Sequence, residues 1–115
     1  DREALRTASA AAGDADVLLF SYGDGTAYSR VLCSPGNGIG EDPATGSSVA
    51  PLCAGLARDG ALDAERRSLT VLQGVQMGRP SVLFARFDRD ASLGVTETLV
   101  GGDVVPMIEG QLTVR

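Results

Sequence analysis

The sequence predicts an α+β fold in which a mainly antiparallel sheet of about seven short strands surrounds one central apolar helix. Segments rich in Val, Leu, Thr and Phe recur along the chain, with glycines between them. One segment in the middle has apolar residues at helical spacing and almost no charge. The chain has 115 residues, of which 43% are hydrophobic and 22% charged. This length and composition predict a single globular domain over residues 1–115.

The first element is a short alanine-rich helix. Residues 2–12 favour a helix because Ala is the strongest helix former, and Gly13 is a suitable residue for its end. The apolar face of this helix consists mostly of Leu5 and alanines. We therefore interpret residues 1–13 as a linking helix and expect the packed body of the domain to lie within residues 14–115.

Two strands and a long loop come next. The apolar run at residues 17–22 predicts a buried strand that ends in a turn, and residues 27–33 predict a second strand that could pair with it as a hairpin. Residues 34–46 contain four glycines and two prolines, which is typical of an irregular loop. A loop of this length in a compact domain is more often functional than a mere connection.

The central helix is predicted over residues 45–58. Its apolar positions form a helical stripe that consists of Val49, Leu52, Cys53 and Leu56. Pro51 is comfortable only in the first turn of a helix, so the helix either begins as late as Val49 or is kinked. A helix that is apolar on most sides is expected to be buried.

The second half of the chain is predicted to consist of strands. The strand segments are residues 68–73, 81–88, 96–100, 104–108 and 111–114. Short strands connected in this way favour an antiparallel sheet. Gly101 and Gly102 are expected to form a hairpin turn or a bulge between two of the strands.

Composition excludes several classes of function. The net charge is −5 and the sequence pI is about 4.5, so we expect no nucleic-acid partner. The chain has no His, and all ten of its cationic residues are Arg. The chain alone therefore cannot supply a Ser-His-Asp or Cys-His centre, a His-based metal site, or a lysine Schiff base.

The sequence also predicts where the protein is located. The longest apolar runs are far shorter than the roughly 20 residues that a membrane span needs. No secretion signal is visible, and we expect a cytoplasmic protein. We also expect Cys33 and Cys53 to be buried reduced thiols, although they could pair or act as an acid/base couple.

The junction between the loop and the central helix is the most informative candidate site. The first N–H groups of a helix lack internal partners and carry partial positive charge, so a carboxylate or phosphate could bind there. Gly46 would let an anion approach the backbone, and Ser47 and Ser48 would add hydroxyl donors. Asp42 could then bind an amine or hydroxyl of the same ligand. The alternative is ordinary capping, in which Thr45 or Ser47 acts as the N-cap.

A second candidate is the segment of residues 73–81. Its two glycines, four residues apart, predict a bulge or tight turn between strands. Arg79 could pair with a carboxylate of the substrate or of the protein. The favoured alternative is a purely structural role for this segment.

Several motifs together resemble the PhzF-like proteins of phenazine biosynthesis. The matching strings are GIGEDPATGS at residues 38–47, QG at 73–74, MGRPS at 77–81, VGG at 100–102 and EG at 109–110. The resemblance implies a fold like that of diaminopimelate epimerase, with two similar lobes and an active site in the cleft between them. It implies that this chain is the C-terminal lobe alone, since residues 17–115 cover only the second half of the family's usual length.

The resemblance also implies an activity, which is isomerisation of a small carboxylate-bearing metabolite by proton transfer without a metal or organic cofactor. Asp42 matches a polar residue that contacts the substrate or relays protons, so we assign it the catalytic role. Ser47 matches a substrate-binding hydroxyl, and Gly46 would offer backbone contacts to the substrate carboxylate. With Ser48 beside them, these residues are the predicted substrate site.

The chain departs from the family pattern in one important respect. The family's principal general base is a Glu of the first lobe, assisted by a His, and neither matches a residue here. We therefore expect catalysis only with a first lobe from another chain. The expected partner is a separate first-lobe chain, or otherwise further copies of this chain in a homo-oligomer. The alternative hypothesis is a non-enzymatic anion-binding or structural subunit that lacks the catalytic base.

Overall fold

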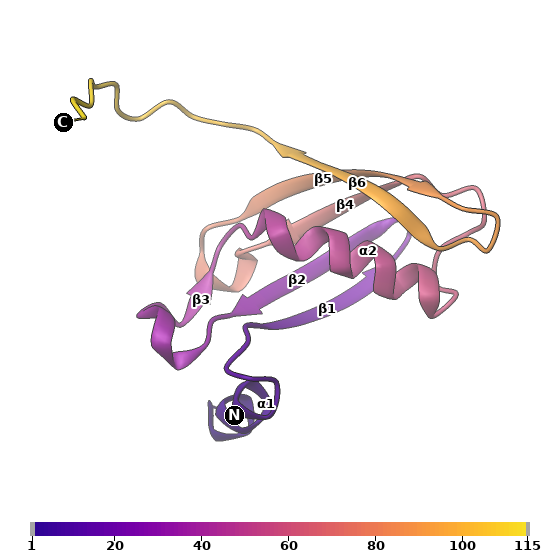
Figure 1. Cartoon of the computed structure of the whole chain (residues 1–115), viewed down its shortest axis with the longest axis horizontal. Coiled ribbons are helices and arrows are strands. Elements are labelled where there is room, and N and C mark those ends of the chain that lie inside the picture. The colour runs from indigo at the N-terminus through magenta and orange to yellow at the C-terminus, as the bar shows by residue number, and fades with distance from the viewer. Residues whose placement is uncertain (1, 115) are drawn as a thin grey trace.

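The computed structural model describes residues 2–114, in which a sheet is covered on one face by a helix (Figure 1). The helices are α1 (Arg2–Ala11) and α2 (Val49–Arg58). The strands are β1 (Val17–Gly23), β2 (Thr26–Leu32), β3 (Glu41–Asp42), β4 (Ser68–Gln73), β5 (Ser81–Arg89) and β6 (Val95–Gly102). Single 3₁₀ turns occur at Pro35–Asn37 (η1), Gly46–Ser48 (η2) and Val75–Met77 (η3).

The sheet is mixed. Its strands follow the order β1-β2-β4-β5-β6, and the short β3 pairs with β2 off this path. Every pairing is antiparallel except that of β2 with β4, which is parallel. The parallel pairing follows from the connection, because the chain between β2 and β4 includes α2, and parallel neighbours need a crossover of this kind. The prediction of a mainly antiparallel α+β fold is confirmed at this level.

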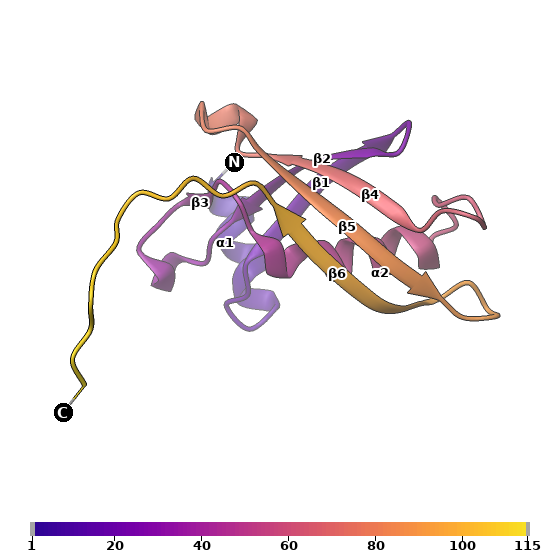
Figure 2. The same ribbon diagram turned by 90° about the horizontal axis from the view of Figure 1, so that it is seen from above.

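The core lies between α2 and the sheet (Figure 2). The predicted apolar stripe of α2 is buried, namely Val49, Leu52, Cys53 and Leu56. It packs against the inward side chains of the neighbouring strands, which include Leu69, Val71, Leu83, Ala85 and Phe87. Because these side chains hold α2 against the sheet, the start of α2 is fixed beside the ends of β4 and β6.

The N-terminal part largely follows the predictions. Helix α1 ends at Ala11, and Gly13 adopts a left-handed conformation with φ of 75°. Strands β1 and β2 form the predicted hairpin, whose turn residues Asp24 and Gly25 both have positive φ. The prediction that β1 is buried was wrong, because β1 lies at the edge of the sheet. Its residues Leu19 and Phe20 are about half exposed.

The predicted strand at residues 96–100 is part of β6, but the predictions for residues 101–114 were wrong. Residues 104–108 and 111–114 form no strand, so the described sheet has six strands rather than about seven. Gly101 and Gly102 belong to β6 instead of forming a turn. The chain then runs away from the sheet as an extended, exposed tail over residues 103–114 (Figures 1 and 2). The sequence has the composition of strands here, but no strand among the described residues 2–114 pairs with the tail to complete a hydrogen-bonded ladder.

The two thiols differ in burial. Both Cys33 and Cys53 are free, as expected. Cys53 is buried in α2, but Cys33 is only half-buried.

No helix in residues 2–114 combines the length and the apolar character that crossing a membrane would require.

Candidate functional site

The candidate site begins at the turn before α2. Residues Gly46–Ser48 form the 3₁₀ turn η2, which runs directly into α2 at Val49. The helix therefore begins late, and Pro51 lies in its first turn, where the missing N–H does no harm. The N–H groups of Gly46 and Ser47 open this continuous helical stretch, so no carbonyl inside it can accept from them. They carry partial positive charge and are available to an anion.

Side-chain capping does not explain the serine and threonine residues here. Thr45 precedes η2 and Ser48 precedes α2, and neither side chain makes a capping hydrogen bond. The Thr45 hydroxyl instead donates to the carboxylate of Asp42. The Ser48 hydroxyl donates to the carbonyl of Thr45 at 2.8 Å, and Ser47 is exposed. The capping alternative for Thr45 and Ser47 is therefore wrong.

Asp42 is held in a defined orientation. It lies in β3, opposite Val31 of β2, and is half-buried. Its Oδ2 accepts from the Thr45 hydroxyl, and its Oδ1 accepts a longer hydrogen bond of 3.4 Å from the N–H of Ala44. The Asp42 carboxylate therefore folds back over the loop that leads to Gly46.

The neighbouring residue, Glu41, anchors β3 to the sheet. Its two carboxylate oxygens accept from the guanidinium of Arg30 at 3.0 and 2.7 Å. These hydrogen bonds lower the pKa of Glu41, although partial burial opposes the shift. The bidentate geometry fixes the direction of the Glu41 side chain, and with it the strand position of Asp42.

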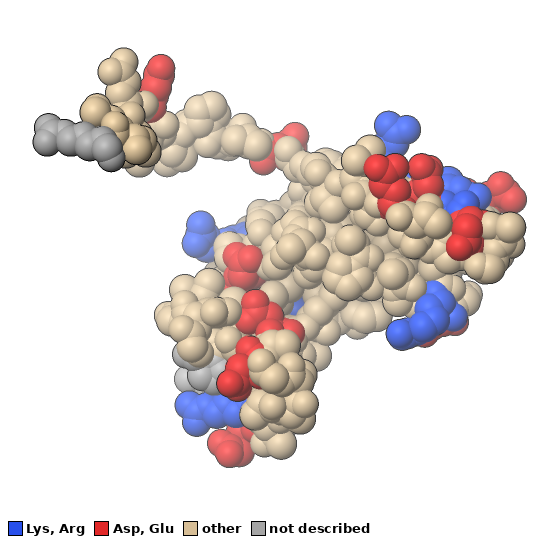
Figure 3. Space-filling view, viewed as in Figure 1, with Lys and Arg blue, Asp and Glu red and all other residues tan. Residues whose placement is uncertain are grey.

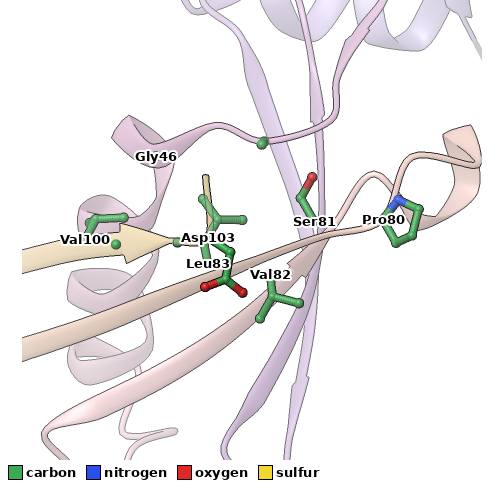
Figure 4. A pocket seen from close by; sticks show the side chains of 10 residues that line it. Gly46, Pro80, Ser81, Val82, Leu83, Val100 and Asp103 are labelled. Carbon is green, nitrogen blue, oxygen red and sulfur yellow. The ribbon is translucent and has the colours of Figure 1, made fainter. Parts of the chain in front are cut away.

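A pocket of about 520 Å³ lies in front of η2. Its walls come from Ala44 and Gly46 of the loop, residues 80–83 at the start of β5, and residues 100–103 at the end of β6 (Figure 4). In this view the Ser81 side chain rises from β5 toward the loop that precedes α2. A Cβ added at Gly46 would lie 3.8 Å from a methyl group of Val100, so the bare Gly46 backbone forms part of the wall.

The structure brings only some of the predicted site residues to this pocket. Gly46 lines it, whereas Asp42, Ser47 and Ser48 lie beside it and are not part of its lining. Sequence reasoning missed Asp103, which brings a negative charge to the pocket wall. It also missed the contacts of Gln73, although a polar residue in the inward series Leu69, Val71 and Gln73 could have signalled them.

The second candidate segment forms a tight turn. Residues Val75–Met77 make the turn η3, with a left-handed glycine on each side of it. Within residues 2–114, the exposed guanidinium of Arg79 takes part in no ion pair. Pro80 and Ser81, which follow, line the pocket.

Charged side chains are distributed unevenly over the surface. In Figure 3 they gather at two ends of the body, near α1 with the β3 loop and near the β5–β6 turn, whereas the surface over α2 between them is largely uncharged. Within residues 2–114, no group of three or more Cys, Asp or Glu side chains is arranged to hold a metal ion. The start of the helix, at Gly46, is a source of positive potential at the pocket.

Comparison with known proteins decides the family. Residues 15–110 match the family model described as phenazine biosynthesis-like protein. The chain belongs to this PhzF-like family. The sequence-based identification is thereby confirmed.

Three curated members of the PhzF-like family are similar to the chain. Trans-2,3-dihydro-3-hydroxyanthranilate isomerase of Pseudomonas chlororaphis is 38% identical over 90 residues, which cover 78% of this chain and 32% of the relative. The isomerases of the same name from Pseudomonas fluorescens and Pseudomonas aeruginosa are 37% and 36% identical, over 78% and 77% of the chain. The PhzF-like chain therefore spans about a third of the length of these relatives.

Proposed function

We propose that this chain is the second lobe of a cofactor-independent isomerase that transfers a proton on a small carboxylate-bearing metabolite. The observation that carries the proposal is the meeting of the helix start at Gly46, a pocket of about 520 Å³ and the oriented carboxylate of Asp42. The related proteins named as isomerases of trans-2,3-dihydro-3-hydroxyanthranilate support this substrate class. Isomerisation by proton transfer takes a proton from one atom and returns it to another, so it needs no oxidant or reductant.

The helix start is the proposed carboxylate site. The N–H groups of Gly46 and Ser47 would donate to the substrate carboxylate, and the exposed Ser47 hydroxyl would add a third donor. The Ser48 hydroxyl already donates to Thr45, so its proposed contact with substrate requires that bond to change partner. Asp42 would contact an amine or hydroxyl of the substrate, or relay a proton.

The proposed catalytic base comes from a first lobe outside this chain. The chain has no His and spans about a third of the length of its relatives. The apolar side chains of the tail also support a partner, since Val104, Val105, Met107, Ile108, Leu112 and Val114 are between 75% and 94% exposed. Exposed apolar segments of this kind commonly mark interaction sites. We propose a separate first-lobe chain as this partner, ahead of a second copy of this chain.

The test is turnover by the purified complex of this chain with its native partner. Incorporation of deuterium from D₂O into trans-2,3-dihydro-3-hydroxyanthranilate reports proton transfer directly. We expect Asp42→Asn to slow incorporation by roughly 10²-fold or more, as loss of a general acid or base does. The matched control Asp88→Asn, on an exposed position of β5, should leave the rate unchanged.

Two outcomes would contradict the proposal. A wild-type complex that binds anthranilate but neither isomerises trans-2,3-dihydro-3-hydroxyanthranilate nor incorporates deuterium into it would favour the non-enzymatic anion-binding subunit. A chain that forms a stable monomer in its native context and binds no carboxylate would favour a structural role.

A further inference from the structure

Gln73 is a buried polar residue at the end of β4. Gln73 is 0% exposed. It follows Leu69 and Val71 in the alternating series of β4 residues that face the core. A buried amide is costly unless its donors and acceptor find partners. Gln73 would be an unfavourable choice at a core position unless its hydrogen bonds serve the neighbouring loop.

Two of its hydrogen bonds reach the candidate site. The Gln73 Nε2 donates to the backbone carbonyl of Asp42 at 2.8 Å and to the Thr45 hydroxyl at 2.9 Å. Its Oε1 accepts a longer hydrogen bond of 3.4 Å from the Ser29 hydroxyl. One buried side chain of β4 therefore binds both ends of the loop from Asp42 to Thr45.

These hydrogen bonds also set the direction of the Thr45 hydroxyl. A hydroxyl has one proton, and the Thr45 oxygen already accepts from Gln73. Its proton is thereby directed to Oδ2 of Asp42, the only other partner that its hydroxyl has among residues 2–114. The Thr45 hydroxyl thus links the Gln73 amide to the Asp42 carboxylate.

Gly74, directly after Gln73, lies in close contact with the same loop. It has a φ of 74°, and a Cβ placed on it would lie 2.3 Å from the carbonyl oxygen of Arg79 and 2.9 Å from that of Pro43. Any side chain at this position would collide with backbone on both sides, so the loop can approach β4 only over a glycine. Gln73 and Gly74 therefore act on the same loop, one through hydrogen bonds and the other through close contact.

We propose that the Gln73-Gly74 pair at the end of β4 is the positioning element that orients the carboxylate of Asp42. Gln73 does not line the pocket, and it would act through Thr45 and the Asp42 backbone. The significance of this orientation for catalysis rests on the proposed function, but the orientation itself does not.

The test is the side-chain conformation of Asp42 in solution, measured without ligand on the whole chain. Three-bond couplings from the Asp42 carboxyl carbon to its backbone nitrogen and carbonyl carbon report the χ1 rotamer. We expect one rotamer in the wild type and a mixture of rotamers in Gln73→Met, which has a similar volume but no donor. A purely structural role for Gln73 would lower stability without changing these couplings.

Two further variants keep the test decisive. Val71→Ala removes a buried side chain two positions earlier in β4, and it should lower the thermal midpoint but leave a single Asp42 rotamer. Thr45→Val breaks the link between Gln73 and Asp42 without creating a buried cavity, and it should give the same mixture as Gln73→Met.

A single, unchanged Asp42 rotamer in either Thr45→Val or folded Gln73→Met would overturn the proposal. Because the measurement needs neither substrate nor partner, it can fail while the isomerase proposal stands, and it can succeed if that proposal falls.

Discussion

Arg30 and Glu41 show how single residues hold the loop that carries Asp42. Both carboxylate oxygens of Glu41 bind the Arg30 guanidinium, across the pairing of β2 with β3. The Glu41 side chain is 13% exposed, whereas that of Arg30 is 42% exposed. Solvent therefore weakens the pair, and we expect a modest contribution to stability that depends on pH.

The sign of this pH dependence follows from the lowered pKa of Glu41. Hydrogen bonds from Arg30 favour the carboxylate in the folded state, so the folded pKa lies below the ordinary value of 4.5. The stabilisation is fully present above that value and is lost as the pH falls through the folded pKa. We expect the urea midpoint of the wild type to exceed that of Glu41→Gln at neutral pH, with a difference that shrinks below about pH 4.5.

The control for this measurement is Glu65→Gln, since Glu65 is exposed and forms no ion pair among residues 2–114. Its difference from the wild type should stay near zero from pH 3 to 7. A constant difference for Glu41→Gln down to pH 3 would show that the hydrogen bonds with Arg30 do not favour the carboxylate.

At the scale of elements, α2 determines where the site lies. Its buried face is fixed against the sheet, so the turn η2 that leads into it is held where Gly46 meets the pocket at the start of β5 and the end of β6. The thiol of Cys53 is part of this face, and burial raises its pKa to about 11. Burial is also the main cause that raises the pKa of Cys33, with help from nearby acidic groups, but this thiol is only half-buried.

Thiol labelling tests this packing. At pH 8, a pKa of about 11 leaves roughly one Cys53 thiol in a thousand ionised, and the packed helix also blocks the reagent. We expect a disulfide reagent to modify Cys33 first and Cys53 at least about a hundredfold more slowly, with both fast in denaturant. Cys33→Ser should remove the fast phase and Cys53→Ser should keep it. Equal rates in the native chain would mean that α2 does not pack as described.

The periodic elements were predictable because each burial pattern is local. The stripe of α2 and the alternation of β4 can be read from the spacing of apolar residues, and β4 agrees with its prediction at both ends. The two-residue strand β3 and the parallel pairing of β2 with β4 were not predictable, because they depend on how distant segments meet. The same limit hid the role of Gln73, whose partners lie 28 and 31 residues earlier in the chain.

The candidate site could also be predicted in part from the local sequence. The glycine and serine residues at 46–48 indicated a helix start that could bind an anion, and the structure places that start at a pocket. The function of Thr45 could not be predicted, since its hydroxyl could equally have capped the helix. Only the closeness of Asp42 and Gln73 decides which hydrogen bond it makes.

At the scale of the whole molecule, the tail of residues 103–114 is the part of the chain that does not pack against the sheet or the helices. Every residue of the tail is exposed, so it contributes little to the stability of the remaining chain. We expect a chain that ends at Asp103 to unfold within about 0.5 kcal/mol of the full chain in urea, as changes at exposed positions usually do. The same truncation should abolish association with the first-lobe partner.

A matched variant separates the two effects. Replacing Met107 and Ile108 with Ser keeps the length of the tail but removes two side chains that are 82% and 94% exposed. This variant should retain stability and weaken the association with the partner. A large loss of stability on truncation would mean that the tail packs on its own sheet in solution, contrary to the proposed role.

The central claim is that the start of α2 binds a carboxylate, and the most direct measurement is an NMR titration of the backbone amides of Gly46 and Ser47 with anthranilate. Anthranilamide, which lacks the negative charge, is the matched ligand control. Gly46→Ala should weaken binding, because its Cβ points toward Val100 in the pocket, while Gly55→Ala should leave binding unchanged. We predict saturable shifts of these two amides with anthranilate only; no shift, or an equal response to anthranilamide, would contradict the account.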